Sequence, residues 1–163
     1  MYLHIIKHLD FNLMLLNNLS EIELLKLHQD ITLELKTRGI IRTENILGDY
    51  AEHLVCKLLN LTLSVSSSRA IDAFDNIGLT YQIKARRLSS NTSVPTIKSL
   101  RSFEFDFLIL VLFNEDYTVK FCGKLSSDLA KELATPNPRV NGYRLNLSAR
   151  LLSDKRIEIL VLK

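Results

Sequence analysis

An acid, an amide and a lysine fall close together in the segment DAFDNIGLTYQIKARR, residues 72–87. Asp72 lies near the end of one expected strand, and Gln82 and Lys84 lie on the next strand after a short turn. Because residues two apart in a strand point to the same face, Gln82 and Lys84 should project together, and antiparallel pairing can bring Asp72 near them. Such a polar group is costly to bury unless something binds it.

These side-chain types suit the hydrolysis of a phosphodiester around a divalent metal ion. The reaction needs a hard cation held by oxygens, an activated water and positive charge near the developing phosphorane. Asp72 can bind the metal directly, the carbonyl oxygen of Gln82 can supply a second ligand, and Glu52 on a preceding helix can complete the shell. Lys84 can orient or help deprotonate the attacking water. The pattern therefore predicts Mg²⁺ or Mn²⁺ as the cofactor.

Four further basic residues are candidates for contacts with the phosphates of DNA. Arg86 and Arg87 follow Lys84 after one intervening residue, and we expect both at the rim of the acidic site. Lys98 and Arg101 lie in the next segment of the chain. A solvated basic face is the alternative interpretation of the same charges. The formal net charge of +3 permits nucleic-acid binding but does not indicate it, because clustering is the diagnostic feature.

Two helices are expected before the strands. The first begins at Ser20, since residues 20–23 match a capping box, and apolar residues then recur at helical spacing up to a stop signal at Arg38-Gly39. The second should span about 48–59 and end near Asn60. Its expected core face consists of Ala51, Leu54, Val55 and Leu58.

The pattern then changes to strands, expected over residues 61–65, 70–74, 79–85, 105–113 and 117–122, with a polar loop over about 88–96. The run 105–113 is nearly continuously apolar, which predicts a central strand, buried on both faces, beside 79–85. A last helix should run from Ser126 to about Ala134, and 143–147 is a candidate edge strand. This order predicts an α/β sandwich around a mixed sheet.

The bulk composition is that of an ordinary folded domain. The chain has 163 residues, of which 47% are hydrophobic and 24% charged, so we expect one domain: an N-terminal helical part (1–40), a core (41–135) and a C-terminal extension (136–163). No apolar stretch is long enough to span a membrane, and no signal peptide is evident. Cys56 and Cys122 form no ligand array, which favours a reducing compartment and a cytoplasmic location.

The order of a helical Glu, a strand Asp and then Gln-x-Lys on the next strand resembles the PD-(D/E)xK nuclease superfamily, and its Gln form is similar to that of Mrr-type restriction endonucleases. Residues 48–52 (GDYAE), 72–75 (DAFD) and 81–87 (YQIKARR) are similar to stand-alone bacterial restriction-endonuclease-like proteins. The likeness is tightest over residues 38–87 and extends to about 122. No Pro precedes Asp72, and Gln82 replaces the usual acid.

This resemblance implies a restriction-endonuclease-like α/β sandwich preceded by N-terminal helices, and a Mg²⁺-dependent endonuclease acting on DNA in restriction or repair. No specificity domain is evident, so cleavage of both strands calls for a homodimer or another subunit. The alternative keeps the fold without the chemistry: a nucleic-acid-binding module, or an accessory subunit of a defence system. An interaction protein without a nucleic-acid role is the third hypothesis.

Overall fold

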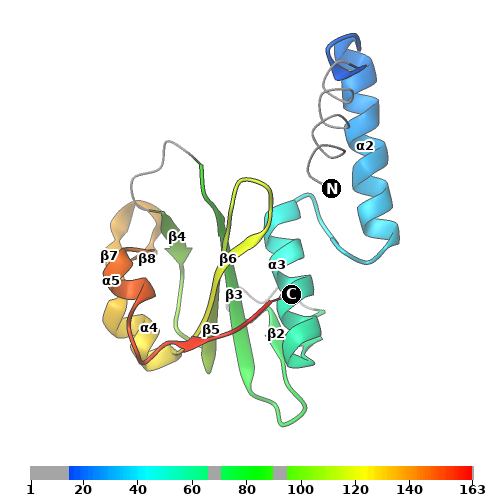
Figure 1. The fold of residues 1–163 in the computed structure, drawn as a ribbon. Helices are drawn as coiled ribbons and strands as arrows, with labels where there is room; N and C mark the ends of the chain where they lie inside the picture. The colour runs from blue at the N-terminus through cyan, green and yellow to red at the C-terminus, as the bar shows by residue number, and fades with distance from the viewer. Residues whose placement is uncertain (1–14, 66–70, 90–94, 163) are drawn as a thin grey trace. The chain divides into compact units, whose positions relative to one another are not determined.

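The computed structural model describes residues 15–65, 71–89 and 95–162, apart from the side chains of residues 98, 99 and 140 (Figure 1). The chain divides into two compact units, Met1–Glu44 and Asn45–Lys163. No helix in the described part of the chain is both long and apolar enough to cross a membrane.

The first unit contains helix α2, Glu21–Thr37. Its capping box is confirmed: the Ser20 hydroxyl accepts from the backbone N–H of Glu23, and the Glu23 carboxylate accepts from the backbone N–H of Ser20 at 2.8 Å. These bonds satisfy N–H groups that have no partner within the helix. The helix stops as predicted, since Gly39 adopts a φ of +67°, a left-handed conformation that glycine tolerates.

The second unit begins with helix α3, Ile46–Leu59. The Asn45 side chain caps it by accepting from the N–H of Gly48, and Asn60 ends it in the left-handed conformation, as expected. Ala51 and Val55 are fully buried. The expected core position of Leu58 is wrong, because its side chain is 42% exposed.

A six-stranded sheet forms the centre of this unit. Its order is β1-β2-β3-β5-β6-β9, in which only β3 and β5 are parallel, so the sheet is mixed and mostly antiparallel. The strands are β1 Thr62–Leu63, β2 Ala73–Phe74, β3 Thr80–Arg87, β5 Phe107–Phe113, β6 Val119–Ser126 and β9 Glu158–Ile159. The prediction of β5 as a central strand beside β3 is confirmed, and residues 108–113 are buried. Residues 66–70, which include part of an expected strand, lie outside the described residues.

A second sheet of three strands, in the order β4-β8-β7, was not predicted. It consists of β4 Thr96–Leu100, β8 Gly142–Asn146 and β7 Thr135–Asn137. The strand expected at 143–147 is confirmed as β8, but its expected edge position is wrong, because β8 lies between β4 and β7. Gly142 permits a close approach of β8 to β4: a Cβ there would lie 2.5 Å from the carbonyl oxygen of Leu100.

The two faces of the six-stranded sheet carry different layers. Ala51 and Val55 of α3 share one buried cluster with Tyr81 and Ile83 of β3. On the other face, alternate β5 residues, such as Leu110, share a cluster with the inner residues of the three-stranded sheet and with helices α4, Ser127–Leu133, and α5, Ala149–Leu152. The second unit is therefore an α/β domain with two cores, and α3 and the three-stranded sheet belong to opposite layers.

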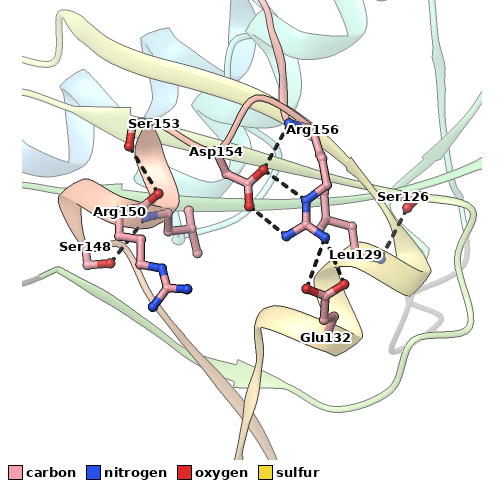
Figure 2. A network of polar contacts seen from close by, with 9 residues as sticks. Ser126, Leu129, Glu132, Ser148, Arg150, Ser153, Asp154 and Arg156 are labelled. Carbon is pink, nitrogen blue, oxygen red and sulfur yellow. Dashed lines mark hydrogen bonds and ion pairs between the residues drawn. The ribbon is translucent and has the colours of Figure 1, made fainter.

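Arg156 holds the segment before β9 in place (Figure 2). Its guanidinium donates to both carboxylate oxygens of Glu132 on α4, each at 3.0 Å, and to Asp154 at 2.8 Å. Hydrogen bonds from Arg156 hold the pKa of Asp154 at about 2, below its usual value of 3.8. These contacts tie the C-terminal segment to α4.

Candidate active site on strand β3

Asp72 and Gln82 are in direct contact across the β2–β3 hairpin. Ala73 pairs with Tyr81 in the antiparallel register, which places Asp72 opposite Gln82. The carboxylate oxygen Oδ2 of Asp72 accepts from Nε2 of Gln82 at 2.8 Å and from the backbone N–H of Ile83 at 2.7 Å. Asp72 therefore accepts from the backbone N–H of Ile83, which lies just past the two β3 residues that pair with β2.

The turn of this hairpin is built around Asp75. Its Oδ1 accepts from the N–H groups of Ile77 and Leu79 at 3.1 and 2.9 Å, and its Oδ2 accepts from the Tyr81 hydroxyl at 3.3 Å. Gly78 has a φ of +89°, which the turn requires and which side chains with a Cβ rarely adopt. The turn thus sets the register that brings Asp72 to Gln82.

Lys84 lies on the same face of β3 as Gln82, because the two residues are two apart. Gln82 is 2% exposed, whereas Lys84 is half-buried. No described residue forms a hydrogen bond or an ion pair with the Lys84 ammonium. A half-buried lysine without an anionic partner is available to a bound anion, and this is the chemistry expected of it.

Arg86 and Arg87 do not occupy a common rim. Arg86 shares the face of Gln82 and Lys84, and its Nε is buried without a hydrogen-bond partner among the described residues. Arg87 lies on the opposite face, with its guanidinium 4.8 Å from the centre of the Tyr117 ring. The expected shared position is wrong, since successive residues of a strand point to opposite faces.

The other two expected DNA contacts lie around β4. Lys98 is part of this strand, but its side chain lies outside the described part of the structure. Arg101 follows the strand and is exposed. DNA contact by Arg86, Arg87, Lys98 and Arg101 remains a prediction.

Glu52 belongs to a different layer from the other three expected catalytic residues. It is half-buried on α3, next to Ala51, which packs in the cluster of Tyr81 and Ile83. Those β3 residues point away from the face of Gln82 and Lys84. The structure thus brings Asp72, Gln82 and Lys84 to one face of the hairpin, and a role of Glu52 as a metal ligand remains a prediction.

The donor set on the hairpin fits a hard cation. An ionised carboxylate has about four acceptor positions, and the Asp72 oxygens use two of them in the bonds from Gln82 and Ile83. The Gln82 amide directs its nitrogen to Asp72, which leaves its carbonyl oxygen as an acceptor. Oxygen donors of this kind are those that Mg²⁺ and Mn²⁺ prefer. No group of three His, Cys, Asp or Glu that could hold a metal occurs within the described ranges, so water would have to complete the shell.

No protein-family model matches this sequence, and no curated protein aligns with it significantly. The function must therefore be inferred from the residues and their positions in this fold.

One basic surface was not predicted from the sequence: Arg139 and Arg144 lie at a groove on the three-stranded sheet. The sequence feature that could have indicated this surface is the lack of any Asp or Glu in residues 133–153.

Proposed function

We propose that this protein is a metal-dependent endodeoxyribonuclease, acting in restriction or repair in the cytoplasm. The observation that carries the proposal is the contact of Asp72 with Gln82 beside Lys84, which has no partner among the described residues. An acid, an amide oxygen and a free ammonium on one face of a hairpin match the needs of phosphodiester hydrolysis. The mixed sheet with its parallel β3–β5 pair and helix α3 on one face supports a restriction-endonuclease-like sandwich.

Asp72 and Gln82 would hold Mg²⁺ or Mn²⁺, which when bound supplies Lewis-acid activation of a phosphate oxygen and of water. Lys84 stabilises the charge that develops on the phosphate and orients the attacking water. Arg86 follows on the same face, and its half-buried guanidinium is a candidate donor to a phosphate. One such site cuts one strand, so cleavage of both strands calls for a homodimer.

The decisive test is a cleavage assay on plasmid and branched DNA with Mg²⁺, Mn²⁺ or EDTA. The variant Lys84→Met removes the ammonium but keeps the apolar stem, and cleavage should fall by about 10²–10⁴-fold. Lys120→Met is the matched control, because Lys120 is exposed on β6. Cleavage by Lys84→Met at the rate of the wild type would overturn the proposed role.

One observation favours the alternative, a nucleic-acid-binding module or accessory subunit that has lost the chemistry. The Gln82 amide and the N–H of Ile83 both donate to Oδ2 of Asp72, so this oxygen has its partners without a cation. If the wild type binds DNA but cleaves no DNA form with either metal, this alternative replaces the nuclease.

A further inference from the structure

The basic residues of this chain are unevenly distributed. Residues 76–103 and 133–153 contain no Asp or Glu, although the chain has 18 of them among its 163 residues. The same two stretches carry eight Lys and Arg: Lys84, Arg86, Arg87, Lys98, Arg101, Arg139, Arg144 and Arg150. The electrostatic mark of a nucleic-acid surface is basic residues gathered on one face, so the positions of these residues in the fold decide which of them form such a surface.

The fold joins these two stretches in the three-stranded sheet. Strand β4 comes from the first stretch, and β7, β8 and the short helix η1, Pro138–Val140, come from the second. The three strands therefore contain no acidic residue. Ile97 and Leu145 turn inward to the core, and their neighbours Thr96, Arg144 and Asn146 line an outer groove.

This groove has a volume of about 800 Å³, and two arginines are its only charged lining residues. It is lined by Thr96, Pro136, Asn137, Pro138, Arg139, Arg144 and Asn146. The lining residues include two arginines, two asparagines and a threonine, with no aromatic ring and no carboxylate. Amides, a hydroxyl and guanidinium groups are the donors that contact phosphate and sugar in DNA complexes.

Both arginines in the groove have donors to spare. Arg144 uses its Nε to donate to Thr135 at 3.1 Å, and no described carboxylate pairs with its guanidinium. Arg139 has no hydrogen bond or ion pair with any residue that the structure describes. Arg156 differs, because its guanidinium is paired with the carboxylates of Glu132 and Asp154 (Figure 2).

We propose that this groove on the three-stranded sheet binds the sugar–phosphate backbone of double-stranded DNA through Arg139 and Arg144. The choice of DNA rests on the proposed function, but binding here does not require the chemistry of Asp72, Gln82 and Lys84. The groove thus gives the C-terminal part of the chain a role in holding the substrate.

The test is the salt dependence of binding to a fluorescently labelled 30-base-pair duplex, measured by anisotropy in EDTA so that no cleavage occurs. Each phosphate contact contributes about −0.9 to the slope of log K against log salt concentration. Relative to 1 M salt, one contact therefore raises the affinity at 0.1 M salt by about eightfold. R139Q should lose about one contact. R139Q/R144Q should lose about two, with a roughly 60-fold fall in affinity.

Two controls separate charge from structure. R144K keeps the charge but loses the bond from Nε to Thr135, and it should retain most of the slope. R38Q removes one charge from α2, where Arg38 already pairs with Glu34 at 2.7 Å, and should bind as the wild type does.

An R139Q/R144Q protein with the slope and affinity of the wild type overturns the proposal, as does a wild type that does not bind the duplex. Tighter binding of an RNA duplex overturns DNA as the ligand. A protein that shows the expected slopes but cleaves no DNA refutes only the nuclease. A protein that cleaves DNA with unchanged slopes in R139Q/R144Q refutes only the groove.

Discussion

Substitution of Asp72 separates its structural role from its proposed role in metal binding. Asp72→Ala removes the acceptor of two donors, Nε2 of Gln82 and the N–H of Ile83, which belong to residues that are only 2% and 5% exposed. A hydrogen bond to a charged group contributes about 1.5–3 kcal/mol. Because Asp72 is itself half-buried, water can reach part of the vacated space, so we expect a loss of about 3 kcal/mol in the free energy of unfolding.

Asp72→Asn keeps an oxygen at the same place and should cost only about 1 kcal/mol, the difference between a charged and a neutral acceptor. It nevertheless removes the negative charge that a divalent cation needs. Mg²⁺ at ten times its dissociation constant should stabilise the wild type by about 1.4 kcal/mol through mass action. Asp72→Asn should lose this gain.

The assay is urea unfolding followed by circular dichroism, in EDTA and over a series of Mg²⁺ concentrations. Asp116→Asn is a matched control, because Asp116 is an exposed acceptor of the Thr118 side chain. If Mg²⁺ still stabilises Asp72→Asn against urea as much as it stabilises the wild type, the metal binds elsewhere. A cost of Asp72→Ala below about 0.5 kcal/mol, typical of ordinary surface changes, would show that its two hydrogen bonds do not stabilise the hairpin.

Three further outcomes are expected. Gln82→Glu sets a second carboxylate against Asp72, so the variant should be less stable than the wild type in EDTA and gain more from Mg²⁺ in the same urea assay. Because Arg156 lowers the pKa of Asp154 from 3.8 to about 2, the stability that this pair contributes is complete above about pH 4 and is lost as the pH falls toward 2. Arg156→Gln should therefore flatten the fall of the melting temperature between pH 4 and 2, and an unchanged profile would contradict this. Leu110→Ala, at a fully buried position on β5, should cost about 2–5 kcal/mol of unfolding free energy in urea, and a loss under 1 kcal/mol would count against the central placement of β5.

The local elements of this protein could be predicted because their signals lie within a few residues. The capping box at Ser20 and the stop at Gly39 bound α2, and Asn60 ends α3. The nearly continuous apolar run of β5 predicted a central strand, since such a run is stable only where both faces of the strand are buried. The contact of Asp72 with Gln82 also belongs to this local class, because a short turn sets the pairing of β2 with β3.

The pairing of strands that lie far apart in the chain could not be predicted from these local signals. Strand β4 was expected to be loop at its start, and its partner β8 lies more than 40 residues further along the chain. The layer to which Glu52 belongs depends on which face of the sheet α3 covers, and that is decided by packing between distant segments. Arg87 was misplaced for a simpler reason, that the alternation of a strand was not applied to the two arginines.

The sequence by itself determined helices α2, α3 and α4, the central strand and the hairpin that carries Asp72, Gln82 and Lys84, because caps, turns and apolar periodicity act over a few neighbouring residues. Only the tertiary structure decided that two acid-free stretches meet in one small sheet and form a groove around Arg139 and Arg144. Sheet pairing joins residues far apart in the chain through backbone hydrogen bonds, which carry no side-chain signature.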